Sequence, residues 1–431
     1  MSQINTLIKP THNCNLRCNY CFHEKYGYEK KLLDMNKLKK YIDLLSENYK
    51  YINLVWHGGE ALTVSLDYYE EIYNYCDSKN SKFMFSVQTN GTLLTQKIVD
   101  FFNRTNTNIG LSFDGLNNEL MRRHTYETLE GIKLLQKNNY NPGAIIVINQ
   151  NNVKNLINEY EYFKSMNLNM KINPMFNDGA AVKGGLPSLD PNEYIKYFTN
   201  FFKYWINDKT CNINVTTCEE LVNLVLNEHS KVCTFNSCLG KWLCLDSDGI
   251  IYPCDRLCTD EYNLGNIEDI TSISEVFMND NFLKLLEKSI LRRDECIKTC
   301  EYYKNCYSGC NANSILSELE GINISCYIQK GILKELKEYM EHLELIGEGG
   351  TDFRPAFEYV NHLIEQGEFY HLKGLIYFTD GKGTYPKKKP PYQTAFIFMQ
   401  EEYEDVDVPP WAVKLIVDAE DLDEGEEEHE Y

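Results

Sequence analysis

The hydrophobic pattern from residue 3 to about 205 alternates between two kinds of segment. Short apolar runs have the length of buried strands, and longer segments between them repeat apolar residues at helical spacing. Strands are predicted at 4–9, 52–56, 83–88, 109–113, 144–148 and 170–173, and helices at 36–48, 66–78, 93–104, 126–138 and 153–165. Such alternation means parallel pairing with right-handed crossovers. It predicts an α/β fold, an incomplete (β/α)6 barrel of the TIM type with its functional groups at the carboxyl ends of the strands.

The pattern changes after the sixth strand. Residues 176–191 hold three glycines and two prolines, and form either a cover over the functional site or a plain surface connection. Helices are predicted near 192–207 and 217–229. A hairpin should follow, because Trp242–Leu245 and Ile250–Tyr252 flank an Asp-Gly turn signal.

The last part of the chain is a small α/β segment of its own. After a helix at 331–345, an amphipathic helix to about 366 precedes apolar runs at 372–378, 394–399 and 412–417, and a mostly acidic tail closes the chain. We therefore divide the chain into a barrel (1–205), a cysteine-rich domain (206–345) and this segment (346–431). Half a sheet cannot bury both faces alone, and we expect no separate peptide-binding domain before the barrel. We expect the segment to dock a substrate.

Composition narrows the classes of partner. The formal net charge is −20, which argues against a nucleic-acid surface, since that requires a basic patch. The sequence shows neither a signal peptide nor an apolar run long enough to span a membrane, so a cytoplasmic protein is expected. In that compartment the 16 cysteines indicate metal ligands rather than disulfides. Three lie at 14–21 and twelve at 211–326.

The first cysteines form one tight loop, Cys14, Cys18 and Cys21, closed by Phe22. Three thiolates can hold three irons of a [4Fe–4S] cluster and leave the fourth iron open, unlike electron-transfer clusters with four cysteines. A zinc knuckle completed by His12 or His23 is the alternative. An open iron requires a chelating ligand, and S-adenosylmethionine offers an amine and a carboxylate.

With three later stretches, this loop resembles the radical SAM superfamily. The stretches are Trp56-His57-Gly58-Gly59-Glu60, the strand end at Asn90, and the strand exit carrying Ser112 and Asp114. The resemblance implies that Gly58, Gly59 and Glu60 meet the methionine amine. It also implies contacts from the other strand ends to the ribose or methionine of S-adenosylmethionine.

The second cysteine group resembles the SPASM domain of radical SAM enzymes that modify peptides and proteins. It departs from that pattern once, with three residues rather than two between Cys296 and Cys300. The resemblance implies two auxiliary [4Fe–4S] clusters, three in all, and a structural zinc domain is the alternative. The implied ligands are Cys233, Cys238, Cys254 and Cys310 for one cluster, and Cys296, Cys300, Cys306 and Cys326 for the other. Of the remaining cysteines, Cys244 is expected in the core, and Cys258 is a rival ligand.

Two further resemblances bear on function. Asp255 directly follows Cys254 and matches the Asp thought to be the base of sulfatase-maturating enzymes; burial that raised its pKa would suit that role. An ordinary turn beside Arg256 is the alternative. Residues 346–431 resemble half of a von Willebrand factor A-like domain with an acidic tail, and Thr351 and Asp380 match two elements of its metal site. The Asp-x-Ser-x-Ser element of that site is absent.

Together these features predict a radical SAM peptide maturase. By resemblance, an external donor of the flavodoxin or ferredoxin type would reduce the first cluster, which cleaves S-adenosylmethionine to a 5′-deoxyadenosyl radical. That radical would take hydrogen from a residue of a ribosomally made peptide, and an oxidative thioether crosslink is the expected product. The alternatives are oxidation of a sulfatase Cys or Ser to formylglycine and, more distantly, a non-enzymatic zinc-binding scaffold.

Overall fold

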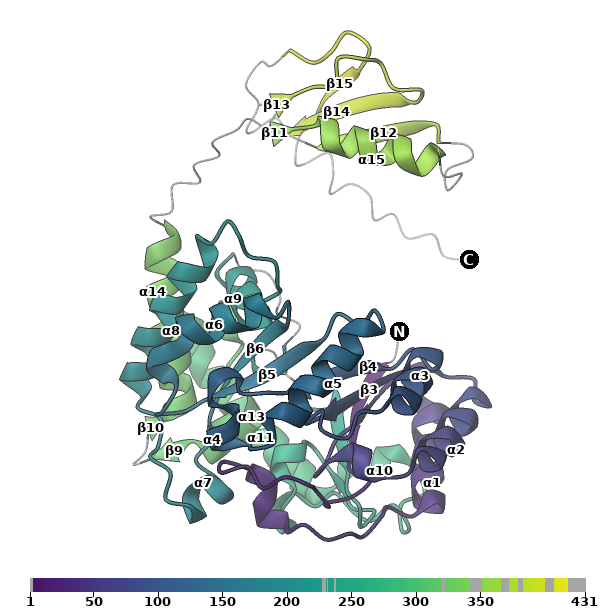
Figure 1. Cartoon of the computed structure of the whole chain (residues 1–431), viewed down its shortest axis with the longest axis vertical. Coiled ribbons are helices and arrows are strands. Elements are labelled where there is room, and N and C mark those ends of the chain that lie inside the picture. Colours follow the sequence, from purple (N-terminus) through teal and green to yellow (C-terminus); the bar gives the residue numbers. More distant parts are fainter. Residues whose placement is uncertain are drawn as a thin grey trace. The chain divides into compact units, whose positions relative to one another are not determined.

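A computed structural model describes residues 3–226, 230, 232–235, 238–319, 322–341, 351–365, 372–378, 383–399 and 407–417. The chain divides into two compact units, Met1–Met340 and Glu341–Tyr431 (Figure 1). Each unit is described by itself below.

The first unit is built on six parallel strands in sequence order. They are β1 (Gln3–Ile8), β2 (Tyr51–Trp56), β3 (Lys82–Thr89), β4 (Asn108–Ser112), β5 (Gly143–Ile148) and β6 (Asn169–Pro174). The main helices between them are α1 (Met35–Asn48), α2 (Leu66–Asp77), α3 (Gln96–Arg104), α5 (Thr125–Lys137) and α6 (Leu156–Ser165). The predicted partial barrel is confirmed, since each predicted strand and helix of this region is present within a few residues of its expected bounds.

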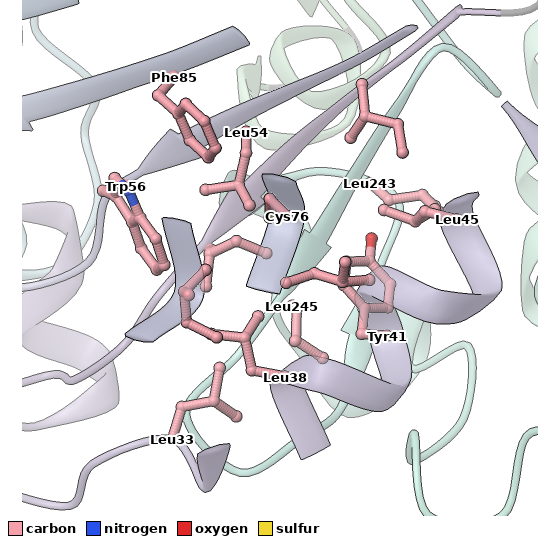
Figure 2. Packing of buried hydrophobic residues seen from close by; sticks show 14 of the residues in the cluster. Leu33, Leu38, Tyr41, Leu45, Leu54, Trp56, Cys76, Phe85, Leu243 and Leu245 are labelled. Atoms are coloured by element: carbon pink, nitrogen blue, oxygen red, sulfur yellow. The ribbon is translucent and has the colours of Figure 1, made fainter. Parts of the chain in front are cut away.

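Alternating burial explains why these segments become strands. In β1, Ile4, Thr6 and Ile8 are fully buried while their neighbours are not, because side chains along a strand point to opposite faces. Helices α1 and α2 cover one part of the sheet, and Figure 2 shows Leu38, Tyr41 and Leu54 among the side chains packed there. Cys76 lies in the same core and is buried.

The hairpin of the cysteine-rich region joins the same sheet. Strand β7 (Trp242–Leu245) pairs in parallel with β1, and β8 (Ile251–Tyr252) pairs antiparallel with β7. The hairpin itself was predicted, but its position beside β1 was not. Leu243 and Leu245 are fully buried in the barrel core (Figure 2), and each contributes about 1.5–3 kcal/mol by that burial. The second cysteine group is therefore an extension of the barrel.

The rest of the first unit is largely helical. Its helices are α4 (Asn118–Met121), α7 (Ala180–Lys183), α8 (Pro191–Ile206), α9 (Thr216–Val225), α10 (Ile273–Met278), α11 (Asp280–Thr299), α12 (Tyr303–Cys306), α13 (Asn311–Leu316) and α14 (Ile324–Glu341). Helix α14 begins before its predicted start at residue 331, so its first turn includes Cys326. Among the described residues, no helix is both long and apolar enough to cross a membrane.

The second unit contains a three-stranded parallel sheet in the order β12-β14-β15. Its strands are β12 (Gly374–Phe378), β14 (Gln393–Met399) and β15 (Val413–Val417), and α15 (Arg354–Glu365) supplies Phe357 to its core. A short parallel pair joins β11 (Thr351–Asp352) to β13 (Gly383–Thr384). Asp380 and the side chain of Thr351 lie outside the described part of the structure, so the resemblance to a von Willebrand factor A-like metal site stays a prediction.

Candidate active site

The three-cysteine loop follows β1, and its thiols lie together in a partly exposed position. The charges of Cys18 and Cys21 are close enough to Cys14 to act on it, and burial raises the pKa of the Cys14 thiol to about 12. Each thiol would lose its proton on binding a metal. Three adjacent sulfur donors with partial access fit a [4Fe–4S] cluster with one open iron.

The glycines of the Gly-Gly-Glu motif fit against the chain that leads into this loop. The backbone N–H groups of Gly59 and Glu60 donate to the carbonyls of Thr11 and Asn13 at 3.1 and 2.8 Å. A methyl group on Gly59 would lie 2.3 Å from the Asn13 carbonyl oxygen, and Gly58 has a φ of +117°. Glycine is therefore required here for the position of the cysteine loop itself, which the sequence-based prediction did not include.

Glu60 is buried and fixed between β2 and β3. Its carboxylate accepts hydrogen bonds from the backbone N–H groups of Leu62 and Asn90 and from the Thr89 hydroxyl at 3.0, 2.8 and 2.7 Å. Burial raises the pKa of Glu60, although these three donors act in the opposite direction. The side chain is thus held rigidly at the carboxyl ends of the strands, and its contact with a methionine amine stays a prediction.

Asn90 and Asp114 also hold the cysteine loop. The amide of Asn90 donates to the side chain of Asn15 at 2.9 Å, and the hydroxyl of Tyr20 donates to Asp114 at 2.5 Å. Asn15 and Tyr20 are both loop residues. Ser112 accepts a hydrogen bond from the side-chain amide of Gln88 at 2.9 Å. The structure brings these predicted cofactor residues to one end of the sheet, where two of the three position the loop.

Arg122 is a site residue that sequence reasoning missed. Its guanidinium donates to the Tyr20 hydroxyl at 2.7 Å, and its charge lowers the pKa of Cys18 against the larger, opposite effect of burial. It follows the short helix α4 and belongs to no recognisable motif, so only the fold shows that it supports the cysteine loop.

The second cysteine group separates into two sets by proximity. Within the first set, charges on Cys310 act on the other three members, Cys233, Cys238 and Cys254. Within the second set, the charge of Cys300 acts on Cys296, Cys306 and Cys326. This grouping is the one that the resemblance to SPASM domains implied, and the ligand assignment itself stays a prediction.

Arg292 lies between the two sets. Its guanidinium interacts with Cys310 and Cys238 of the first set and with Cys296 and Cys326 of the second. It also donates to the side chains of Asn311, at 2.6 Å, and Ser314. A single half-buried cation therefore acts on both sets of thiols.

Asp255 is held at the end of β8 among three basic side chains. Burial on its own raises the pKa of Asp255, but His57, Lys9 and Arg256 outweigh it and the net pKa lies below the ordinary value. The condition that would suit a base, a pKa raised by burial, is therefore not met, because the buried Lys9 and its neighbours compensate the carboxylate. Asp255 is therefore ionised and can accept a proton.

Two residues considered as alternative metal ligands, Cys258 and His12, make other contacts in the structure. The Cys258 thiol lies 3.1 Å from the ammonium of Lys9 and 3.9 Å from the Cys244 sulfur. Cys244 is fully buried, as expected of a core residue. His12 pairs with Asp246 at 2.7 Å through one ring nitrogen. These contacts favour neither Cys258 as an auxiliary-cluster ligand nor His12 as a fourth zinc ligand.

A cavity of about 580 Å³ opens at the end of β6, beneath the 176–191 loop. Its mostly apolar wall includes Phe176, Phe198 and Ile332, with Arg256 and Asn313 as polar groups. The guanidinium of Arg256 stacks 3.2 Å from the centre of the Phe176 ring. The loop also contacts the cysteine loop, since the Ala180 N–H donates to the Cys21 carbonyl at 3.0 Å. Arg256 thus links the cavity to Asp255, its neighbour in sequence.

The comparisons with known proteins agree with this geometry. Residues 8–162 match the family model of the Radical SAM superfamily. A cysteine-type anaerobic sulfatase-maturating enzyme of Clostridium novyi is 28% identical over 354 residues, covering 76% of this chain and 93% of that protein. A serine-type anaerobic sulfatase-maturating enzyme of Bacteroides thetaiotaomicron is 25% identical, covering 78% and 88%.

Solved structures share the fold. The enzyme anSMEcpe with bound AdoMet superposes with a TM-score of 0.70 at 24% identity, covering 79% of this chain and 98% of that chain. SuiB of Streptococcus suis gives a TM-score of 0.53 at 16% identity, covering 73% and 74%.

Proposed function

We propose, from the premise that this chain is a radical SAM enzyme of the oxidoreductase type, that it oxidises a cysteine or serine side chain of a peptide or protein to formylglycine. The observation that carries this proposal is the position of Asp255, whose carboxylate lies close to the ring of His57 at the end of β2 and whose neighbour Arg256 lines the cavity. Relatives that align over most of their own length are named for sulfatase maturation, which supports the same reaction.

Each group of cysteines would have its own role in this reaction. Cys14, Cys18 and Cys21 would hold a [4Fe–4S] cluster that, with S-adenosylmethionine, supplies the one-electron chemistry that removes hydrogen from a substrate carbon. The two cysteine sets described above would hold two auxiliary clusters whose chemistry is electron acceptance. A donor of the flavodoxin or ferredoxin type would supply electrons to the first cluster.

Asp255 accepts the substrate proton. Oxidation of a cysteine side chain to a thioaldehyde removes two hydrogens, one as an atom and one as a proton, together with one further electron. Water then replaces sulfur, and hydrogen sulfide leaves. For a serine the same loss gives the aldehyde directly. Lys9, His57 and Arg256 lower the pKa of Asp255, so the carboxylate is ionised before it takes the proton but is a weaker base than burial alone would make it.

A thioether crosslink is the second candidate, and the fold is shared with SuiB, one structure of which holds its precursor peptide SuiA. It begins with the same removal of hydrogen and likewise releases two hydrogens in total. It differs in that the substrate keeps its sulfur, because the thiolate closes onto the oxidised carbon.

The experiment is an anaerobic assay of the reconstituted full chain with S-adenosylmethionine, a reductant and sulfatase active-site peptides in matched Cys and Ser versions. Mass spectrometry should show loss of two hydrogens with exchange of sulfur for oxygen in the Cys peptide, and loss of two hydrogens in the Ser peptide. Loss of two hydrogens with sulfur retained in a Cys-rich peptide would favour the crosslink. Formation of 5′-deoxyadenosine without any modified peptide would contradict both.

We also propose that the segment 346–431 docks the substrate. Deleting it should raise KM for the substrate protein and leave kcat largely unchanged, since the cysteines and Asp255 all lie in the first unit. An unchanged KM would contradict this role.

A further inference from the structure

The cavity beneath the 176–191 loop is larger than the side chain that the proposed reaction oxidises. Its volume is about 580 Å³, and protein pockets of about 300–1,000 Å³ typically enclose whole small-molecule ligands. A cysteine or serine side chain consists of a β-carbon and a single sulfur or oxygen atom, and it must reach Asp255 rather than the far wall. Most of the cavity is therefore left for another part of the substrate.

The inner wall of the cavity is apolar and belongs to the barrel core. Tyr194 and Phe198 of α8, Leu221 of α9 and Ile332 of α14 line it and are all buried. They are members of one hydrophobic cluster, against which Ile328 of α14 also packs. Because a close-packed core holds its side chains in fixed rotamers, this wall keeps its shape whether or not a ligand is present.

The charged groups of the wall are already engaged by other groups of the protein. Arg256 donates to the side chain of Asn313 and stacks on the ring of Phe176. The other four charged lining residues have partners as well: Asp178 pairs with Lys25 at 2.5 Å, Asp190 accepts from the Glu193 N–H at 2.8 Å, Glu220 accepts from the Ser230 hydroxyl at 2.5 Å, and Lys171 acts on Cys233. A charged substrate group would therefore lose its hydration and find no unused counter-charge among the described residues of the wall, whereas an apolar side chain gains free energy on burial here.

We propose that this cavity binds a large apolar side chain of the substrate peptide, of the size of leucine, methionine or phenylalanine. The inference rests on the proposed function, because it concerns the peptide whose cysteine or serine Asp255 would deprotonate. Arg256 lines the cavity and is the next residue after Asp255. An extended peptide advances about 3.3 Å per residue, so the apolar residue lies within about three positions of the oxidised one.

Two lining residues allow the cavity to be filled without removing a core side chain. Leu316, at the end of α13, is 38% exposed, and Ile328 of α14 is half-buried. Leu316→Trp and Ile328→Phe each add volume at the cavity wall. Leu283 of α11 is 39% exposed and is not among the described residues that line the cavity, so Leu283→Trp is the matched control.

The test measures dissociation constants with the full chain, reconstituted anaerobically and supplied with S-adenosylmethionine but no reductant, so that the peptide binds without turnover. The probes are a sulfatase active-site peptide and variants that carry Leu, Ala or Asp at each of the three positions on either side of the target cysteine. At one position or more, Leu should bind roughly 10- to 150-fold more tightly than Ala, and Asp should bind no more tightly than Ala. Leu316→Trp and Ile328→Phe should largely lose this preference, and Leu283→Trp should keep it.

Equal binding of the Leu and Ala peptides to the wild type at every position, or tighter binding of an Asp peptide, would overturn the proposal. A preference that both cavity-filling variants retain would also overturn it, since the apolar side chain would then bind elsewhere. Adding the reductant separates this inference from the proposed function. Preferred binding of Leu peptides without any oxidised product would reject the reaction alone. Oxidation of all peptides with equal dissociation constants and equal KM values would reject the role of the cavity alone.

Discussion

Replacing Gly59 by alanine should release the cysteine loop from the sheet. The methyl group would lie 2.3 Å from the carbonyl oxygen of Asn13 and 2.4 Å from that of His12. Both contacts are with backbone atoms, which cannot rotate away. Gly59 does not have a positive φ, so the expected cost is steric and not conformational. The loop must therefore move as a unit.

The size of the effect follows from two costs. Overpacking against fixed neighbours costs about 1–3 kcal/mol. If the loop moves away, the hydrogen bond from the Glu60 N–H to the Asn13 carbonyl is lost, which adds about 1 kcal/mol. A total of about 2–4 kcal/mol corresponds to a roughly 30- to 1,000-fold larger population of the open loop.

Hydrogen–deuterium exchange measures this opening directly. The Gly59→Ala variant should lose protection at the amides of residues 59 and 60, and anaerobic reconstitution should yield less iron per chain. Gly143→Ala is the control, because a methyl group there meets only ordinary contacts at 3.4 Å and beyond. Its effect should stay within about 0.5 kcal/mol. Unchanged protection and full iron in Gly59→Ala would refute the steric role of this glycine.

Three further outcomes are expected. Cys18→Ala should lower the iron content by about four atoms per chain and abolish 5′-deoxyadenosine formation; formation at the wild-type rate would disprove the loop assignment. Arg292→Met should lower the reduction potentials of both proposed auxiliary clusters, since it removes a cation that favours the reduced state; a redox titration followed by electron paramagnetic resonance measures this, and unchanged potentials would contradict it. Burial raises the pKa of Glu159 above its ordinary 4.5. The free energy of unfolding of the wild type should therefore fall relative to that of Glu159→Gln as the pH rises from about 4.5 towards the higher folded pKa. Urea denaturation at each pH measures both free energies, and the same pH dependence in the two proteins would contradict this.

The barrel could be predicted because each of its strands is defined by its own residues. Buried positions alternate along β1 and β5, and side-chain patterning of this kind is a local property of the sequence. The hairpin turn at Asp248-Gly249 is equally local. Bounds differ mainly where a helix start depends on tertiary packing, as for α14, which begins at Ile324.

The site could be predicted only in part, because several of its roles depend on distant contacts. The cysteine spacing identified the loop, yet the sequence contained no sign that Tyr20, Asp114 and Arg122 would connect to one another. The lowered pKa of Asp255 depends on distant residues in the same way. Lys9 lies 246 positions away in sequence, and only the fold places it beside that carboxylate.

Strand register is what joins the two cysteine groups into one site. Leu245 pairs with Ile8 where β7 lies along β1, and the Lys9 N–H continues this ladder by donating to the Leu245 carbonyl at 2.9 Å. Lys9 then reaches the backbone carbonyl of Asp255 through its side chain. A slip of two residues would preserve which face is buried but displace the hairpin by about 6.6 Å. That shift would break the contact between Lys9 and Asp255 and separate Asp255 from His57. The apolar pairing of Leu243 and Leu245 with the barrel core therefore determines where the proposed proton acceptor lies.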